Sequence, residues 1–291
     1  MSSRPPIIII GMSRSGTGIL AKMLEDLGLF IGKSKDRNHE AWFFIDLNMW
    51  LLEQSSGGLE NPQAIKYLLK DKEARTLFAK FASYTMKTPK AISYLGLKKY
   101  LSCRTPANLD IPWGWKDPRN TITLPFWLDI FPDAKVIHIY RHGVDVANSL
   151  RVSQDKGLQR LRIKDSLYKN LYWYYLVNKF IPNRKKFIYL RCASLYDGIS
   201  MWEEYVNMSR GHVESLKGRA IEIKYEDMML QPSAELETLA QFCDLNTTDR
   251  DILQASRLAD KSRAYAYINN TELKEFAENK TIKKRLKALG Y

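Results

Sequence analysis

Residues 7–24 read IIIIGMSRSGTGILAKML, and this stretch decides the fold. The β-branched run at residues 7–10 predicts a buried strand, and the pattern at residues 17–27 predicts a helix. A loop rich in glycine and hydroxyl side chains joins them. Such a loop binds phosphate groups, because its backbone N–H groups and the positive end of the helix point into one concavity. The segment therefore predicts an anion site.

The loop differs from one that binds nucleoside triphosphates. That loop reads G-x-x-x-x-G-K-[ST], and its lysine reaches the β- and γ-phosphates. In this chain Gly16 is followed by Thr17 and Gly18, and Arg14 lies inside the loop. The missing lysine argues against an ordinary triphosphate. The alternative is a common strand–glycine–helix turn in which Ser15 merely caps the helix.

Composition narrows the classes of protein and partner. The 291 residues are 45% hydrophobic and include 45 basic against 32 acidic side chains, a formal charge of +13 that attracts anions. We expect no nucleic acid partner, because no helix-turn-helix, zinc-finger or RNA-binding signature accompanies the charge. The cysteines and histidines lack metal-ligand spacing, so no metal is expected. No apolar run approaches the ~18 residues of a membrane helix. We expect a cytoplasmic protein with no transmembrane segment.

Strands and helices alternate along the chain, which predicts an α/β fold with a central, mainly parallel sheet flanked by helices. Strands are expected at residues 7–10, 113–116, 135–140 and 220–225. Helices are expected at residues 17–27, 40–53, 62–84, 125–131, 165–182, 194–217, 233–243 and from about 272. We interpret residues 1–291 as a single domain with helical insertions at about 40–110 and 151–215.

A second strand–helix junction carries another candidate phosphate site. Residues 135–152 read KVIHIYRHGVDVANSLRV, with Arg141 where the strand ends and Ser149 on the following helix. An arginine at the carboxyl end of a strand faces the crevice where open α/β sheets bind ligands. Its guanidinium offers a bidentate fork to a phosphate group, and the hydroxyl adds a donor. The alternative is a surface pair between Arg141 and Asp145.

Together the two motifs resemble those of the sulfotransferases that use 3′-phosphoadenosine 5′-phosphosulfate (PAPS). The Arg14-Ser15-Gly16-Thr17 loop resembles their 5′-phosphosulfate loop, and Arg141 with Ser149 resembles their 3′-phosphate motif. The resemblance implies a P-loop NTPase-like fold. It also implies transfer of a sulfuryl group from PAPS to an acceptor hydroxyl without a metal, leaving 3′-phosphoadenosine 5′-phosphate (PAP). The two insertions would lie on the acceptor side.

Further segments extend the resemblance. Residues 113–121, WGWKDPRNT, resemble the strand end that presents a lysine, here Lys116, to the transferring sulfate in tyrosylprotein sulfotransferases. The RSGT and KDPR motifs are closer to the bacterial and tyrosylprotein members than to the cytosolic phenol enzymes. The R-K-G signature of the cytosolic enzymes is absent, and Arg263 is its nearest counterpart. Gly18 stands where many family loops have a second hydroxyl. The implied donor-binding residues are Arg14, Ser15, Gly16, Thr17, Gly18, Arg141, Ser149 and Arg263.

The resemblance also suggests how charge and protons are handled. Arg14 and Lys116 would supply positive charge to the transferring group and the leaving oxygen. The acceptor hydroxyl needs a general base. Some family members use a glutamate just after the first helix and its loop, where this chain has Glu40 at the start of a helix. Its alternative role is to complement the helix dipole. His39 is the second candidate base.

Other functions remain open at this point. A P-loop kinase-like enzyme would share the strand–loop–helix unit, and a noncatalytic polyanion-binding protein would share the positive charge. The acceptor is not identified: a sugar, a lipid, a phenol and a peptide are all compatible, including an anionic or carbohydrate acceptor. Aromatic side chains could stack on a sugar ring, although aromatics at helical spacing more often form core. They are Tyr168, Tyr172, Trp173, Tyr174 and Tyr175.

Overall fold

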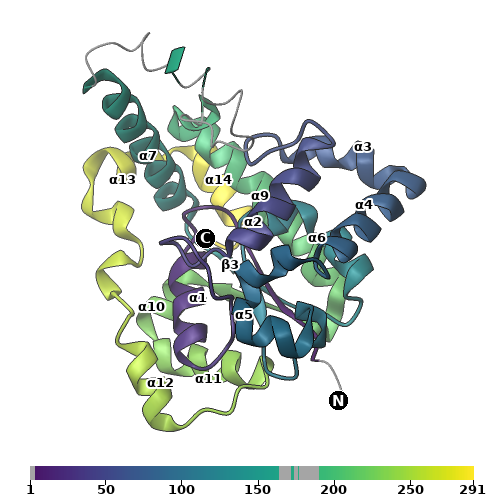
Figure 1. Cartoon of the computed structure of the whole chain (residues 1–291). Coiled ribbons are helices and arrows are strands. Elements are labelled where there is room, and N and C mark those ends of the chain that lie inside the picture. The colour runs from purple at the N-terminus through teal and green to yellow at the C-terminus, as the bar shows by residue number, and fades with distance from the viewer. Residues whose placement is uncertain (1–3, 164–171, 174–175, 177–189) are drawn as a thin grey trace. The chain divides into compact units, whose positions relative to one another are not determined.

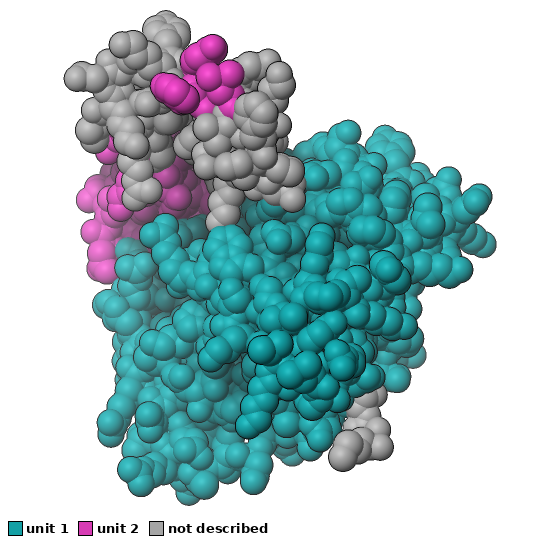
Figure 2. Space-filling model, in the orientation of Figure 1, with its two compact units in different colours: residues 1–142, 204–266 teal, residues 143–203, 267–291 magenta. Residues whose placement is uncertain are grey.

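The computed structural model describes residues 4–163, 172–173, 176 and 190–291 (Figure 1). The chain divides into two compact units, coloured separately in Figure 2. The first contains residues 1–142 and 204–266, and the second contains residues 143–203 and 267–291. The single domain with insertions at 40–110 and 151–215 stays a prediction.

The first unit is built on a parallel sheet. Its strands are β1 (Ile7–Ile10), β2 (Gly114–Lys116), β3 (Lys135–Tyr140) and β4 (Ala220–Lys224). They lie in the order β2-β1-β3-β4, and every pairing is parallel. The predicted α/β class with a mainly parallel sheet is confirmed.

Helices flank this sheet. The described helices of the first unit are α1 (Thr17–Asp26), α2 (Trp42–Glu53), α3 (Ile65–Lys70), α4 (Lys72–Thr85), α5 (Ile92–Cys103), α6 (Asn120–Ile130), α10 (Tyr225–Leu230), α11 (Pro232–Phe242) and α12 (Asp249–Ser256). Helix α9 (Leu195–Leu216) belongs to both units. Short 3₁₀ helices lie at Pro62–Ala64, Pro89–Ala91, Pro106–Asn108, Leu190–Cys192, Lys217–Arg219, Lys261–Arg263 and Ala266–Asn269.

Two hydrophobic layers hold the helices against the strands. In one, Ile9 and Ile137 of the sheet pack with Leu20 of α1 and Leu236 of α11. In the other, the ring of Trp115 on β2 stacks on Phe44 of α2 at 4.0 Å and meets Trp127 of α6 edge-on at 5.0 Å, distances between ring centroids. Large aromatic contacts of this kind fix α2 and α6 on the strand that carries Lys116.

Three expected helices differ from those in the structure, and two of them divide at a capping residue. Residues 62–84 form two α-helices instead of one, since the carboxylate of Asp71 accepts the N–H of Ala74 and starts α4. The C-terminal segment likewise divides into α13 (Thr271–Glu278) and α14 (Lys280–Ala288) at Asn279, which caps α14. The helix expected at 125–131 begins earlier, at Asn120, and contains Pro125 in its interior.

The second unit is helical throughout its described part. It consists of α7 (Gly143–Ile163), the start of α9, α13 and α14. Arg151 of α7 pairs with Glu272 of α13 at 2.6 Å. The helix expected at 165–182 lies almost entirely outside the described residues, as do Tyr168, Tyr174 and Tyr175; Tyr172 and Trp173 are exposed. Within the described ranges, no helix has the length and hydrophobicity needed to cross a bilayer.

Candidate active site

Three of the predicted segments lie at the carboxyl ends of neighbouring strands. Residues 11–16 follow β1, Lys116 is the last residue of β2, and Arg141 follows β3. These strands are neighbours in the order β2-β1-β3, and all run parallel. The carboxyl ends of parallel strands form the crevice where α/β proteins bind ligands. The fold therefore gathers the loop, the lysine and the arginine at one end of the sheet.

The loop after β1 contains residues with positive φ. Arg14 has a φ of 75° and Gly16 a φ of 94°, both in the left-handed region. Gly16 occupies the N-cap position of α1 and no side chain caps that helix, so the alternative role of Ser15 as a cap is wrong. A Cβ on Gly16 would lie 2.2 Å from the ring of Tyr225. Only glycine fits there, and the N–H groups of the first turn of α1 lack partners within the helix.

The neighbouring turn explains the glycine at position 18. A Cβ on Gly18 would lie 3.3 Å from the carbonyl oxygen of Asn38. Within that turn, a carboxylate oxygen of Asp36 accepts the N–H groups of Asn38 at 2.8 Å and Glu40 at 2.9 Å. A hydroxyl-bearing side chain at position 18 would crowd this turn. Gly18 therefore lets the segment that carries Glu40 pack close to the start of α1.

Three guanidinium groups lie close together near the loop. Arg141 donates from Nη2 to the carbonyl oxygen of Arg263 at 2.9 Å, and its guanidinium carbon lies 4.6 Å from the ring centre of Tyr225. The side chain of Arg263 is hydrogen-bonded to Tyr225. Partial burial and then the charges of Arg141 and Arg263 lower the pKa of Arg14. A gathering of like charges of this kind favours the binding of an anion.

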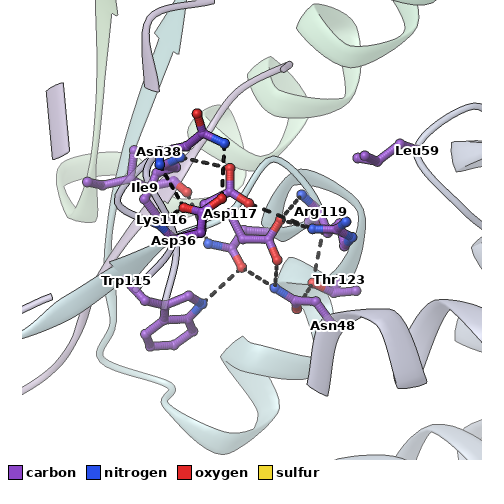
Figure 3. Close-up of polar contacts among 12 residues, drawn as sticks. Ile9, Asp36, Asn38, Asn48, Leu59, Trp115, Lys116, Asp117, Arg119 and Thr123 are labelled. Atoms are coloured by element: carbon purple, nitrogen blue, oxygen red, sulfur yellow. Dashed lines mark hydrogen bonds and ion pairs between the residues drawn. The ribbon is translucent and has the colours of Figure 1, made fainter. Parts of the chain in front are cut away.

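A second cluster surrounds the end of β2 (Figure 3). The ammonium group of Lys116 donates to Oε1 of Glu40 at 2.9 Å, and the lysine side chain is 1% exposed. Nη1 of Arg119 lies 4.0 Å from Oε2 of the same glutamate. Burial raises the pKa of the Glu40 carboxyl, although the charge of Lys116 acts in the opposite direction. A carboxylate with a raised pKa is better suited to accept a proton than an exposed one.

Polar side chains that sequence analysis did not single out support this cluster. Asp117 is fully buried; its Oδ1 accepts the N–H and Nη1 of Arg119, each at 2.9 Å. Its Oδ2 accepts the amide group of Asn48 at 2.9 Å. The same amide group donates to Asn120 at 2.8 Å, and the amide oxygen of Asn48 accepts from Thr123 and Trp127 at 2.7 and 2.8 Å. This network joins α2 and α6 directly behind Lys116.

The sequence held a signal for these residues. Asn48 and Asp46 are the two polar residues in the otherwise apolar stretch 43–52 of α2, and Asp117 and Asn120 lie one and four residues after the buried strand β2. Buried polar side chains require hydrogen-bond partners, so such positions indicate a network. Their hydrogen-bond partners depend on how α2 packs on α6, and the sequence does not reveal that contact.

The two candidate bases face different partners. Glu40 contacts Lys116, whereas Nδ1 of His39 lies 3.0 Å from Oε2 of Glu25 on α1. His39 has a φ of 60°, an uncommon conformation for a residue other than glycine, and this places the two neighbouring side chains in different surroundings. Ser149 lies on α7 in the second unit, so its pairing with Arg141 stays a prediction.

Comparison with known proteins adds to this geometry. The sequence profile of the sulfotransferase family matches residues 5–249. The chain belongs to the sulfotransferase family. Membership makes it an enzyme that transfers sulfuryl groups. No curated protein matches the chain significantly.

One solved sulfotransferase structure shows the same fold at low sequence identity, and others resemble this chain more distantly. A sulfotransferase domain from the curacin biosynthetic pathway superposes with a TM-score of 0.51 at 15% identity, covering 96% of this chain and 99% of that one. The sulfotransferase domain of the Synechococcus PCC 7002 olefin synthase gives 0.49 at 16% identity, covering 100% and 96%. A sulfotransferase from Alicyclobacillus acidocaldarius gives 0.48 at 16% identity, covering 99% and 96%. The P-loop-like α/β architecture predicted from the sequence is confirmed.

Proposed function

We propose that this sulfotransferase uses PAPS as its donor and transfers the sulfuryl group to an acceptor hydroxyl. The observation that carries the proposal is the group of Arg14, Arg141 and Arg263, with Arg141 over the ring of Tyr225, beside a glycine loop without the triphosphate lysine. A donor with phosphate at both the 5′ and the 3′ position needs positive charge at two places. A nucleoside triphosphate needs it at one end only.

The donor contacts follow from the motifs. The N–H groups of residues 16–18 and the hydroxyl groups of Ser15 and Thr17 bind the 5′-phosphosulfate, with Arg14 beside them. Arg141 binds the 3′-phosphate with its fork of N–H donors, assisted by Ser149. Arg263, hydrogen-bonded to Tyr225 and accepting from Arg141 through its carbonyl group, adds charge to the 3′ side.

The transfer step uses the second cluster. The acceptor oxygen attacks sulfur as the bond between sulfur and the bridging oxygen of the 5′-phosphate breaks, and the electron pair leaves with that oxygen. Glu40 takes the proton of the acceptor hydroxyl. Lys116 and Arg14 stabilise the negative charge that develops on the leaving oxygen and the sulfuryl group. The hydrogen bonds to Asp117 orient Arg119, whose guanidinium lies beside Glu40.

A donor comparison tests this proposal. PAP should raise the melting temperature of the chain in EDTA, because a ligand that binds only the native state stabilises it by about 2.7 kcal/mol at a hundredfold excess over its Kd. ATP with Mg²⁺ should have little effect. Stabilisation by ATP with Mg²⁺ and none by PAP would favour a kinase-like enzyme. Equal stabilisation by any polyanion, lost steeply with salt, would favour a noncatalytic anion-binding protein.

The acceptor class stays open in this proposal: sugar, lipid, phenol and peptide hydroxyls all satisfy the chemistry. Radiolabelled transfer from PAPS to one representative of each class would narrow it. We also keep the cytoplasm as the proposed compartment, since three sparse cysteines suit a reducing environment.

A further inference from the structure

Helix α4 carries none of the residues to which the proposed donor binding and sulfuryl transfer give a role. One side of this helix is buried in the first unit, through Ala79, Ala82 and Met86. The opposite side exposes large apolar side chains: Leu77 is 61% exposed, Phe81 42% and Tyr84 68%. Their spacing of four and three residues places them on one face of the helix. An apolar stripe of this size on a surface helix indicates a binding surface.

Neighbouring aromatic rings support the stripe from below and beside it. Trp50 of α2 packs on Phe81 with 4.1 Å between ring centroids and contacts Phe78 edge-on at 5.4 Å. On the adjacent helix α3, Tyr67 is 79% exposed, and the ammonium group of Lys70 lies 6.0 Å from its ring centre. Aromatic side chains with one apolar and one polar end are typical of the boundary between lipid and water.

Positive charge accompanies the stripe. Residues 66–90 contain seven basic side chains and two acidic ones, Asp71 and Glu73. Lys80 lies three residues after Leu77 and four before Tyr84, and Lys87 lies three after Tyr84; both lysines are exposed. Lys80 therefore lies beside the apolar stripe on the helix. Lys87 lies in the turn that follows the C-cap of α4, two residues after its last residue, Thr85. We name Leu77, Phe81, Tyr84, Lys80 and Lys87 the α4 face; α4 is at the right of Figure 1.

We propose that the α4 face docks this protein on the surface of an anionic lipid bilayer. A helix with an apolar stripe beside lysines lies in the plane of such a surface, with its apolar side chains at the boundary of headgroups and acyl chains. The lysines gain free energy from the negative surface potential. The formal charge of +13 adds long-range attraction of the same sign. An anionic bilayer offers negative headgroups for the lysines and, just below them, an apolar interior for the stripe.

Vesicle co-sedimentation of the full chain tests the proposal. We expect the protein to pellet with vesicles of phosphatidylcholine mixed with phosphatidylserine, to stay in solution with phosphatidylcholine alone, and to be released by salt. Leu77→Ser with Tyr84→Ser should lower the partition coefficient about tenfold or more. Lys80→Glu with Lys87→Glu should lower it at least as far. Both pairs are exposed, so the melting temperature should change little.

Matched variants on α12 serve as controls. Leu253→Ser removes an equally exposed leucine, and Arg250→Glu with Arg257→Glu changes the net charge by the same amount as the lysine pair. Leu253→Ser should bind vesicles as the wild type does, and the α12 charge variant should lose much less binding than the lysine pair, because it changes only the long-range attraction. Three results would overturn the proposal: no binding of the wild type to either vesicle, equal loss in the α12 charge variant, or a concentration-dependent dimer that Leu77→Ser with Tyr84→Ser abolishes in the absence of vesicle binding.

Discussion

Glu40 and His39 are adjacent in the sequence, but their side chains contact different partners. Glu40 reaches the buried Lys116, while His39 turns to Glu25 on α1. We predict that Glu40→Gln keeps the affinity for PAP and lowers turnover by roughly 10²–10⁴-fold, because glutamine cannot take the proton from the hydroxyl group of the acceptor substrate. Single-turnover transfer from PAPS measures this.

The pH profile gives a second readout of the same substitution. The raised pKa of Glu40 moves the acidic limb of the wild-type rate upward, since a base acts only when deprotonated. Glu40→Gln should abolish that limb. His39→Ala is the matched control and should leave turnover close to that of the wild type. Normal turnover in Glu40→Gln with loss in His39→Ala would assign the base to the histidine.

For single residues, the sequence indicated the candidates that belong to a motif. It did not indicate those whose role depends on packing in the folded chain. Arg14 and Arg141 were named because each follows a strand in a patterned segment, and Lys116, the last residue of β2, was named from the resemblance of residues 113–121. Asn48 was not, because its role arises from bonds to Asp117 and Asn120 at sequence separations of 69 and 72 residues. Arg263 was named from a weak match, and the structure brings it to Arg141 through a contact over 122 residues.

Among the elements, α6 shows how an apparent helix breaker is accommodated. Pro125 has no N–H, so the carbonyl group of Thr121, four residues earlier, loses its helical partner. Nε2 of His212 on α9 lies 2.9 Å from that carbonyl oxygen and donates to it. Burial lowers the pKa of His212 and keeps its ring neutral. The hydroxyl of Thr121 also accepts the N–H of Gly11 at 3.0 Å, which ties α6 to the loop that follows β1.

This arrangement predicts a coupling between Pro125 and His212. His212→Ala should lower the free energy of unfolding by about 1–3 kcal/mol, since it leaves a carbonyl group without its donor. In a Pro125→Ala background the helix supplies its own N–H to Thr121, so the same substitution should have a clearly smaller effect. Urea denaturation of the four proteins measures the coupling. Equal effects of His212→Ala in both backgrounds would contradict this explanation.

The strands were predicted within one residue at every boundary. In β1, β3 and β4, β-branched residues between turn residues marked the limits, whereas β2 (Gly114–Lys116) has none. The helix limits were predicted less well. Asp71 and Asn279 are capping residues that divide helices, and the hydrophobic pattern alone ran across both. Pro125 was interpreted as the start of a helix, since its tolerance in the interior depends on His212, 87 residues away in sequence.

For the whole molecule, buried ionisable groups predict sensitivity to acid. Burial and the charge of Arg141 lower the pKa of His142 from 6.5 to about 3. Half-burial raises the pKa of Glu222, but hydrogen bonds from His138 and Arg210 outweigh it and lower that pKa from 4.5 to about 2. In both cases the unfolded chain takes up a proton at a higher pH than the folded one. Stability is therefore full above about pH 6.5 and falls as the pH decreases.

Free energies of unfolding at a series of pH values check this. We expect a decrease that begins near pH 6.5 and steepens below pH 4.5, where Glu222 contributes. Glu222→Gln should flatten the lower part of the curve and leave the part above pH 4.5 unchanged in slope. A stability that rises on acidification would show that these groups are not buried as described.

The central claim is that Arg141 binds the 3′-phosphate of the donor. Isothermal titration calorimetry of PAP and adenosine 5′-monophosphate, on the wild type and on Arg141→Ala, tests it most directly. The wild type should prefer PAP by about 2–4 kcal/mol, roughly 30- to 1000-fold. Arg141→Ala should lose most of this preference and bind the monophosphate as before, while Arg250→Ala should retain it. An undiminished preference for PAP in Arg141→Ala, or no preference in the wild type, would contradict the account.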